Sequence, residues 1–408
     1  MPPERAERGW DCLVVGAGPA GATAARRLAL RGRSVLLLDA HRFPRDKCCA
    51  GVISETTVRA LDFPLGRDRA GRDVVERKVS RVVFSYRGRW PRALEPRALE
   101  VRMVMREVFD NFLVEKAREA GAALWDGARA LRLAEERDGV HLLVEREGER
   151  FSLRALAVIG ADGARSVVAR DLGLWRGVRF GGALSGEVRV PPPDFERAAP
   201  FALFDFGALP QGYAWVFPKR EHLSTGVCSM AGGSGGLRRV FDGFLAVQPW
   251  LGRRLSVAVT GAGLPLRTGG PGQRLHGERA VVAGDAAGLV DPLTGEGIHH
   301  AVISGARAAE AVDDLLSGRA SLAAYSERIS SDILPDLHCV QKFASLLLCQ
   351  PLVAYLAGCW SGEVRDLFSA VISGRLSYRE AHGQLSRRWP VRVLGRVLPR
   401  TAPRATLR

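Results

Sequence analysis

A glycine-rich turn close to the N-terminus restricts the fold of this chain more than any other feature. An apolar run precedes Gly16, Gly18 and Gly21, which have the spacing GxGxxG, and a helical stretch and a second apolar run ending at Asp39 follow. In a βαβ unit the glycines permit a tight turn, close approach of a pyrophosphate and close helix–strand packing, while the acid accepts ribose hydroxyls. The free amides of the helix N-terminus favour the anion. The pattern predicts a dinucleotide-binding domain.

Length and composition indicate an ordinary globular protein with two or three domains. The chain has 408 residues, of which 47% are hydrophobic and 25% charged, a mixture that argues against disorder. The seven cysteines are odd in number and show no paired spacing, so we expect neither a disulfide scaffold nor a metal site. The first ten residues mix acids and bases without an apolar run, which predicts no signal peptide and a cytoplasmic protein.

The net charge of +15 is partly concentrated at the C-terminal end of the sequence. Residues 387–408 contain seven arginines and no acid. A nucleic-acid site would combine basic residues with aromatic ones or place them on a recognition helix, and neither pattern is present, so we expect no nucleic-acid partner. The charge favours peripheral contact with an anionic membrane surface, or an anionic diphosphate or phospholipid substrate.

Two further nucleotide-type motifs indicate that the dinucleotide domain is discontinuous. Asp162-Gly163 follows one apolar strand and Gly284-Asp285 follows another, with mostly β-like sequence between them. We therefore predict an α/β fold in which a Rossmann-type FAD-binding domain comprises 8–80, 102–178 and 265–325, an inserted antiparallel β-sheet substrate domain comprises 81–101 and 179–264, and residues 326–408 form a C-terminal helical region with a basic tail.

The choice of FAD rests on a resemblance. The Asp162 and Asp285 motifs, with the Pro-Leu-Thr-Gly-Glu-Gly loop that follows the second, resemble the later FAD fingerprints of p-hydroxybenzoate-hydroxylase-like flavoproteins. That loop would bring backbone amides to the flavin edge, where they stabilise negative charge, and Arg106 matches an arginine that contacts FAD. The resulting candidate cofactor-binding residues are Gly16, Gly18, Ala20, Gly21, Asp39, Ala40, Arg45, Lys47, Cys49, Ala50, Gly51, Arg106, Ala130, Asp162, Gly163, Asp285, Gly295, Gly297 and Ile298.

Two other segments resemble the geranylgeranyl reductase family. The first is Pro-Arg-Asp-Lys-Cys-Cys-Ala-Gly over 44–51, and the second is a complete YxWxFPK motif over 213–219, followed by Gly-Val-Cys over 226–228. The family has Cys-Gly-Gly in the first segment and GxG in the last. Ala50 and Cys228 therefore each replace a family glycine, which leaves the reductase chemistry plausible and puts the substrate in doubt.

The resemblance implies an oxidoreductase acting on CH–CH groups of isoprenoid lipids. Reduced FAD would pass a hydride from N5 to an isolated double bond of a prenyl chain, such as that of a geranylgeranyl diphosphate or prenylated lipid. Cys49 matches the family cysteine near the flavin and is a candidate proton donor, since a free thiol is ordinarily protonated at neutral pH. Tyr213, Trp215 and Phe217 alternate along a strand and would form an aromatic wall for the prenyl chain. We therefore take Cys49, Tyr213 and Trp215 as the candidate catalytic residues.

Several alternatives remain open. A flavin-dependent monooxygenase or halogenase has the same fold, and halogenases resemble this chain through a Trp-x-Trp-x-Ile-Pro motif, but they need a pocket lysine, for which Lys78 is the candidate besides Lys47. A non-catalytic flavin- and lipid-binding protein is a third reading. The electron donor is either NAD(P)H or a protein such as ferredoxin, because no second dinucleotide fingerprint is visible.

The uncharged stretch over 343–360 is interrupted at Pro351 and is short for a membrane span. It predicts either buried, groove-lining helices or an element at a membrane surface or lipid tunnel.

Overall fold

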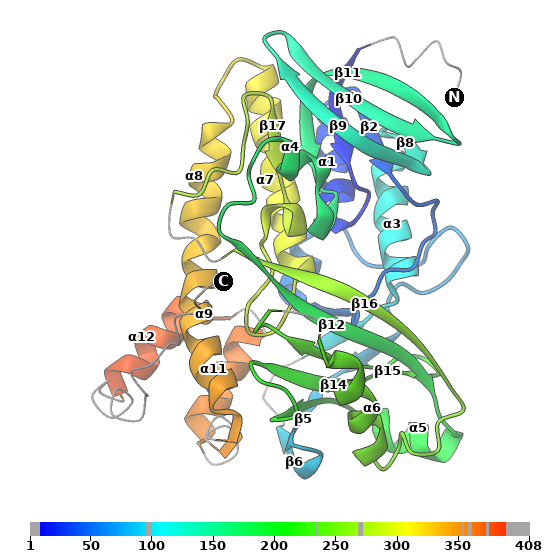
Figure 1. Cartoon of the computed structure of the whole chain (residues 1–408), viewed down its shortest axis with the longest axis vertical. Coiled ribbons are helices and arrows are strands. Elements are labelled where there is room, and N and C mark those ends of the chain that lie inside the picture. Colours follow the sequence, from blue (N-terminus) through cyan, green and yellow to red (C-terminus); the bar gives the residue numbers. More distant parts are fainter. Residues whose placement is uncertain are drawn as a thin grey trace.

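The protein folds into two sheet-centred parts with helices along one side (Figure 1). The computed structural model describes residues 9–94, 100–232, 235–267, 272–352, 355–356, 361–372 and 375–388. The basic tail predicted for 387–408 lies almost entirely outside the described residues. A first sheet with its helices forms the upper part in Figure 1, and a second sheet forms the lower part.

The first sheet has a parallel core with an antiparallel extension. Its order is β8-β2-β1-β11-β10-β9, and β17 also pairs with β11. The pairs among β8, β2, β1, β11 and β17 are parallel, whereas β9, β10 and β11 form antiparallel hairpins. The strands are β1 (Trp10–Val15), β2 (Val35–Asp39), β8 (Ala123–Asp126), β9 (Ala128–Glu136), β10 (Gly139–Arg146), β11 (Glu149–Gly160) and β17 (Ala280–Val282).

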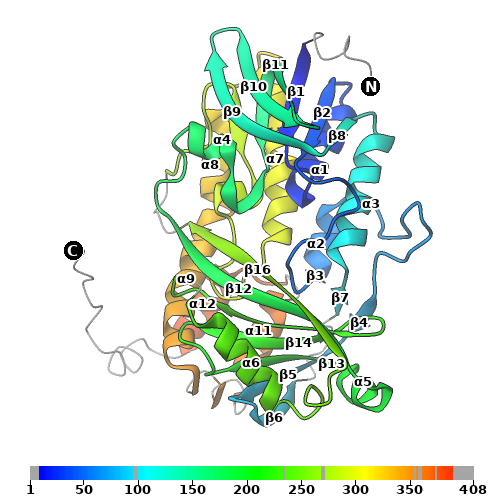
Figure 2. The same ribbon diagram turned by 45° about the vertical axis from the view of Figure 1, so that its right-hand side comes forward.

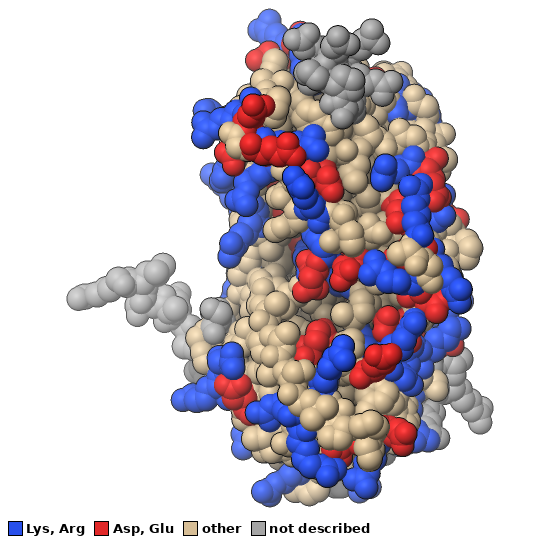
Figure 3. Space-filling view, turned by 90° about the vertical axis from the view of Figure 1, so that its right-hand side faces the viewer, with Lys and Arg blue, Asp and Glu red and all other residues tan. Residues whose placement is uncertain are grey.

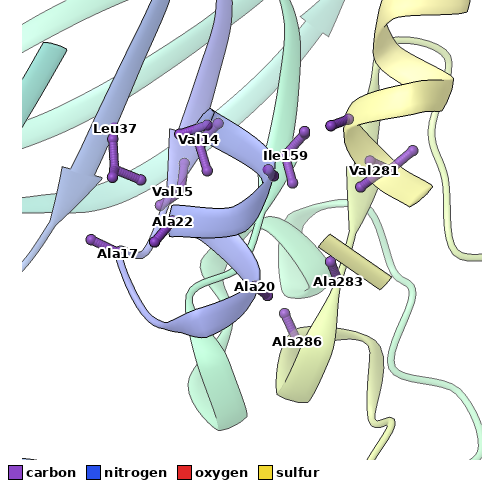
Figure 4. Packing of buried hydrophobic residues seen from close by; sticks show 14 of the residues in the cluster. Val14, Val15, Ala17, Ala20, Ala22, Leu37, Ile159, Val281, Ala283 and Ala286 are labelled. Carbon is purple, nitrogen blue, oxygen red and sulfur yellow. The ribbon is translucent and has the colours of Figure 1, made fainter. Parts of the chain in front are cut away.

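Small residues allow the helices of this part to pack closely against the sheet and each other. The helix α1 (Pro19–Ala29) contacts both α3 (Arg106–Glu119) and α7 (Ile298–Leu316). A Cβ at Gly305 of α7 would lie 2.2 Å from the carbonyl oxygen of Ala20, so only glycine permits this crossing. Figure 4 shows the core that results, with the strand residues Val14 and Ile159 beside α1 and Val281 beside α7.

The second sheet has seven strands in the order β16-β12-β15-β14-β13-β5-β6. All neighbouring pairs are antiparallel except β13 with β5. One face packs against α6, and the other faces the first part (Figure 2). The elements are β5 (Arg81–Tyr86), β6 (Arg89–Leu94), β12 (Val178–Arg189), β13 (Phe201–Phe206), β14 (Gly212–Pro218), β15 (Leu223–Ser229), β16 (Ser256–Arg267), α5 (Pro192–Ala198) and α6 (Leu237–Val247).

A small three-stranded sheet and a set of helices complete the described structure. The sheet joins β3 (Val52–Ser54), β7 (Val101–Met103) and β4 (Arg77–Val79), and the shorter helices α2 (Glu55–Ala60), η2 (Gly163–Arg165), α4 (Val167–Asp171) and η3 (Gly284–Ala287) lie in connections. The C-terminal helices are α8 (Ala323–Asp332), α9 (Leu334–Cys349), α11 (Gly362–Ile372) and α12 (Tyr378–Arg388). Among the described residues, none of the helices is both long and apolar enough to cross a bilayer.

The predicted fold class is confirmed, since the structure combines an α/β FAD-binding fold with an antiparallel sheet and a helical C-terminal region. The division at the predicted domain boundaries remains our proposal. It is supported by the second sheet, whose strands lie within 81–94 and 178–267.

Candidate active site

One large cavity lies between the first part and the inner face of the second sheet. Its volume is about 740 Å³. One side is lined by polar and glycine residues and is called the charged wall here. Gly18, Asp162 and Asp285 come from the three nucleotide-type motifs, Lys47 comes from the segment before the cysteines, and Arg106 comes from the start of α3. The opposite side, which we call the apolar wall, consists of Val82, Phe84, Val101, Met103, Ala202, Phe204, Phe206, Tyr213, Trp215, Phe217, Cys228 and Leu264.

The glycine-rich turn provides space for an anion at the start of α1. Gly16 has φ +96°, and a Cβ there would lie 2.3 Å from the Ala161 carbonyl oxygen. A Cβ at Gly21 would lie 1.8 Å from the carbonyl oxygen of Gly16, whereas at Gly18 the nearest atom is Arg45 Nη2 at 3.7 Å. Gly18 is the N-cap of α1 and Pro19 opens the helix, so the first amides have no partner within the helix. These features suit a phosphate group.

A network of buried charges stands beside this turn. Asp39 accepts the amides of Ala17 and His41, each at 2.9 Å, and Arg45 lies 3.7 Å from Asp39 and 3.1 Å from Asp110. The Nη1 group of Arg45 is buried and has no well-aligned acceptor among the described residues. This Nη1 is the atom that lies 3.1 Å from Asp110 Oδ2, whereas Nη2 is the Arg45 atom nearest to Gly18, so the network holds a guanidinium beside the turn.

Asp110 also holds Arg106, four residues earlier on α3. Two hydrogen bonds of 2.8 Å join the guanidinium to the carboxylate. Burial opposes both charges, but the pair raises the pKa of Arg106 and keeps the pKa of Asp110 below its usual range. Arg106 lines the cavity and also interacts with the thiol of Cys49. A permanent cation is thus fixed beside the cysteine loop.

The cysteine loop, residues 48–51, is fixed to the second sheet by a buried lysine. Lys219, immediately after β14, donates to the carbonyl oxygens of Ala50 at 2.8 Å, Gly51 at 3.1 Å and Val104 at 2.8 Å. Its side chain is fully buried without a carboxylate partner among the described residues, and burial lowers its pKa to about 8. Gly51 has φ +63°, and a Cβ there would lie 2.1 Å from the Val104 carbonyl oxygen.

Both cysteines of the loop are free thiols with different surroundings. Cys49 lines the cavity and accepts the amide of Gly51 at 3.3 Å. Cys48 donates to the carbonyl oxygen of Thr260 at 3.4 Å on β16, and burial raises its pKa. Cys48 lines the cavity as well, so both thiols lie at its wall.

The loop after the third motif closes the charged wall. Lys47 Nζ lies 4.0 Å from the Asp285 carboxylate. It is also close to Gly163, where an added Cβ would lie 3.8 Å from the same nitrogen. Glu296 also lines the cavity; burial, reinforced by Asp291, raises the pKa of its carboxyl to about 7. Burial lowers the pKa of both His299 and His300 to about 4, so both imidazoles are neutral at neutral pH.

Strand register explains the composition of the apolar wall. Tyr213, Trp215 and Phe217 lie on the cavity face of β14, whereas Ala214 and Val216 pack toward α6. Trp215 is paired with Gly226, where a Cβ would lie 2.1 Å from the indole Cζ2.

The second position of the GxG pattern, occupied by Cys228, does not face an indole ring. Tyr213 is paired with Cys228, whose thiol interacts with the tyrosine hydroxyl. The first glycine of the pattern is therefore needed to accommodate an indole ring, while the second position has room for a thiol.

A hydrogen bond joins the two walls. The Tyr213 hydroxyl donates to the carbonyl oxygen of Thr294 in the loop that follows the third motif. Burial raises the pKa of this hydroxyl well above its usual value. Tyr213 is therefore better placed to hold this loop than to donate a proton.

Most of the candidate residues gather at this cavity. The cofactor and substrate candidates that line it are Gly18, Ala20, Lys47, Cys49, Ala50, Gly51, Arg106, Asp162, Gly163, Asp285, Gly295, Gly297, Ile298, Tyr213, Trp215 and Phe217. Gly16, Gly21, Asp39 and Arg45 lie directly behind the lining, whereas Ala40 and Ala130 are outside it. Lys78, the lysine considered for halogenation, is exposed on β4 and pairs with Glu100 at 3.5 Å.

Sequence reasoning missed four residues of the site. Asp110 lies one helical turn after the candidate Arg106 and could have been found by that spacing, whereas Thr294 belongs to the loop after the third motif but its bond to Tyr213, 81 residues away, left no signal. Lys219 belongs to the YxWxFPK motif and Glu296 to the loop after the third motif, so both could have been singled out as charged residues in otherwise apolar surroundings.

The charged wall fits FAD on its own geometry. The open turn at Gly18, the Arg45 guanidinium beside it and the acceptor Asp39 suit a pyrophosphate and an adjoining ribose. The backbone at Thr294–Gly297 and the cations Lys47 and Arg106 suit the flavin end of the same molecule.

Comparisons with known proteins agree with this geometry. Residues 10–200 match the family model described as "FAD binding domain". A digeranylgeranylglycerophospholipid reductase from Methanopyrus kandleri is 32% identical over 354 residues, 83% of this chain and 90% of that protein. A geranylgeranyl diphosphate reductase from Rhodobacter capsulatus is 32% identical over 308 residues, 74% of each chain.

Solved structures share the fold. A geranylgeranyl bacteriochlorophyll reductase-like protein from Thermoplasma acidophilum superimposes with a TM-score of 0.73 at 24% identity, covering 96% of this chain and 99% of that one. A flavin-dependent brominase superimposes with a TM-score of 0.69 at 18% identity, covering 93% and 100%.

Proposed function

Since the chain belongs to the geranylgeranyl reductase family of FAD-dependent oxidoreductases, we propose that it reduces isolated carbon–carbon double bonds in the prenyl chain of a lipid or diphosphate. The observation that carries the proposal is the apolar wall, whose aromatic side chains face the charged wall across one cavity. Relatives are named for prenylated glycerophospholipid and prenyl diphosphate substrates. We propose the same substrate class for this chain.

The cavity suits a reaction on an unactivated alkene. Reduced FAD, when bound, supplies a hydride from N5. An isolated alkene is a poor electrophile, so holding it in position and excluding water must provide much of the rate. Tyr213 and Trp215 are buried on the apolar wall, and Phe204 is partly buried there. They offer ring surface, a Tyr213 hydroxyl committed to Thr294, and a Trp215 indole N–H that has no acceptor among the described residues. A prenyl chain would be held there mainly by ring surface.

We propose Cys49 as the proton donor to the second alkene carbon. It lies on the cavity wall within a loop that Lys219 fixes from behind. Arg106 interacts with the thiol and remains charged beside Asp110, so it would stabilise the sulfur once the proton has left. Trp215 positions the chain, and Tyr213 holds the loop at Thr294.

The electron source and the place where the enzyme meets its substrate belong to the proposal as well. We propose that electrons come from NAD(P)H or a donor protein acting on the bound flavin, and that the enzyme meets its substrate at a membrane surface. The support is the apolar cavity itself, because a prenylated lipid that fits it resides in a bilayer.

Halogenation is the weaker candidate. A flavin-dependent brominase shares the fold of this chain, but the halogenation reaction needs a lysine in the substrate cavity. Lys78 is exposed and paired outside the cavity, and Lys47 lies beside Asp285 on the charged wall.

An anaerobic reaction tests the proposal. The purified flavoprotein is reduced with dithionite and mixed with geranylgeranyl diphosphate or a geranylgeranylated glycerophospholipid, and the flavin absorbance and product mass are followed. We expect flavin reoxidation without oxygen and a gain of two hydrogens per reduced bond. A flavin that stays reduced until air is admitted, with both substrates recovered unchanged, would contradict the proposal.

A further inference from the structure

The tip of the β5–β6 hairpin, residues 86–92, exposes an aromatic side chain and several arginines to solvent. Trp90 is 59% exposed, and Arg87, Arg89, Pro91 and Arg92 are exposed as well. Tryptophan is seldom so exposed in a folded protein. The hairpin tip therefore presents one large amphipathic ring among three guanidinium groups.

The backbone holds the indole in this exposed position. Trp90 has φ +53° and Arg87 φ +51°, values that bulky residues rarely adopt, and the β5–β6 register shifts between Phe84 and Tyr86. The Tyr86 ring stacks on the indole with centroids 6.3 Å apart, and the Tyr355 hydroxyl donates to the Trp90 carbonyl oxygen. Backbone strain of this kind persists where surrounding contacts impose it.

The charges at the hairpin tip are available to a partner. The Arg87 side chain donates to the Gly207 carbonyl oxygen, while the guanidinium groups of Arg89 and Arg92 form no ion pair or hydrogen bond with the described residues. Val247 at the end of α6, 55% exposed, adjoins Gly88 and adds apolar surface. Figure 3 shows Lys and Arg side chains gathered at this lower end of the molecule.

The hairpin tip adjoins the apolar wall of the cavity. Phe84 lines the cavity, Tyr86 packs on the same cluster, and Tyr355, which also lines the cavity, contacts Tyr86 at 6.1 Å between ring centroids. Figures 1 and 2 place β6 at the end of the molecule opposite the β9–β11 hairpins. A continuous series of aromatic rings thus leads from the exposed indole toward the cavity.

We propose that the hairpin tip docks on the headgroup region of an anionic phospholipid bilayer and places the cavity next to its lipid substrate. The docking proposal rests on the proposed function, because it names the surface from which the lipid substrate would enter. Tryptophan favours the membrane interface, and arginines beside it are attracted to anionic headgroups. An acidic electron-donor protein is less well matched, because the hairpin tip adjoins the apolar wall and not the charged wall where the cofactor residues gather.

Vesicle flotation of the full-length, FAD-loaded protein tests the proposal. Phosphatidylcholine vesicles with and without phosphatidylglycerol are compared for wild type, R89E/R92E, W90A and W90F. A matched control, R129E/R132E, reverses two exposed charges on β9 at the other end of the molecule. We expect R89E/R92E to weaken binding to the anionic vesicles about 30-fold or more, W90A to weaken it as well, W90F to restore most of it, and the control to bind like wild type.

Reduction of geranylgeranyl diphosphate dispersed in detergent is measured on the same variants and should be unchanged, since the hairpin tip is outside the cavity. Vesicle binding that is equal in wild type and R89E/R92E, or absent in wild type, would overturn the docking surface. So would slower electron transfer from reduced ferredoxin in R89E/R92E with unaltered vesicle binding, which would assign the hairpin tip to a protein. Tip-dependent vesicle binding without turnover of any prenyl substrate would instead refute the proposed function and leave the docking surface standing.

Discussion

The charged wall and the apolar wall of the cavity are kept in shape by different kinds of interaction. On the charged wall, ionised groups are buried in pairs, as with Arg106 and Asp110, and backbone amides and glycines face the cavity. On the apolar wall, aromatic rings pack edge to face, such as Phe204 on Phe217 at 5.0 Å between centroids. A buried charge cannot lose its partner cheaply, whereas a packed ring tolerates changes that conserve volume.

The difference shows which substitutions this chain can carry. Its two departures from the family pattern, Ala50 and Cys228, are both small residues at the cavity surface, where they alter shape without stranding a charge. The fixed elements of the charged wall show no such departure. Changes in each wall should therefore have unequal consequences.

The largest effect is expected on the charged wall. Gly16→Ala would place a Cβ 2.3 Å from the Ala161 carbonyl oxygen at φ +96°, so we expect essentially complete loss of bound FAD, measured as flavin absorbance per polypeptide. Gly32→Ala is the matched control, since Gly32 also has positive φ (+79°) but nothing within 4 Å. The control should keep its flavin and lose only about 1 kcal/mol of stability. Normal flavin content in Gly16→Ala would show that this turn does not form the site.

The next effect concerns the proton donor. Cys49→Ala should lower the rate of alkene reduction by a factor on the order of 10²–10⁴ while FAD remains bound. Glu296→Gln should lower the rate of alkene reduction by a smaller factor. The pKa of Glu296 is raised to about 7, so its acid form is present below pH 7 and is lost above it. A single-turnover rate that falls above pH 7 in wild type, and is insensitive to Cys49→Ala, would assign the proton to Glu296.

Lys219→Met should damage the junction between the two walls. It leaves three buried carbonyl oxygens without their donor, so we expect a loss of about 3 kcal/mol in the free energy of unfolding, measured in urea. Lys116→Met is the control, because Lys116 forms a partly exposed pair with Glu119 and should cost about 0.5 kcal/mol. Equal unfolding midpoints for the two variants would show that the hydrogen bonds of Lys219 do not stabilise the fold.

The smallest effect is expected from one substitution on the apolar wall, at Cys228. Cys228→Gly restores the family residue and should cost about 1 kcal/mol of stability with turnover nearly unchanged. Gly226→Ala, two residues earlier on the same strand, should be far more harmful, because its Cβ would lie 2.1 Å from the Trp215 ring. Similar turnover in the two variants would mean that Trp215 does not need its present position.

The sequence alone predicts those parts of the site that local spacing determines. Gly16, Gly18 and Asp39 belong to one continuous βαβ unit, and Tyr213, Trp215 and Phe217 share a face because strand side chains alternate. Contacts between distant segments leave no such pattern. Lys219 donates to a residue 169 positions away, and Arg45 is placed beside Asp110 by the packing of α3. Nothing in the neighbouring sequence of either residue indicates its partner.

The hydrogen bond from Tyr213 to Thr294 has a consequence for protein engineering. The strand proposed to bind substrate and the loop proposed to bind the cofactor come from separate chain segments and are joined by this bond. Exchanging residues 178–267 for the equivalent sheet of a relative would transfer substrate preference intact only if the incoming strand brings a hydroxyl to this position. A chimera with phenylalanine there would lose the bond that joins the strand to this loop. Lys219 lies in the same exchanged segment and holds the cysteine loop, so recombination between relatives is constrained at both side chains.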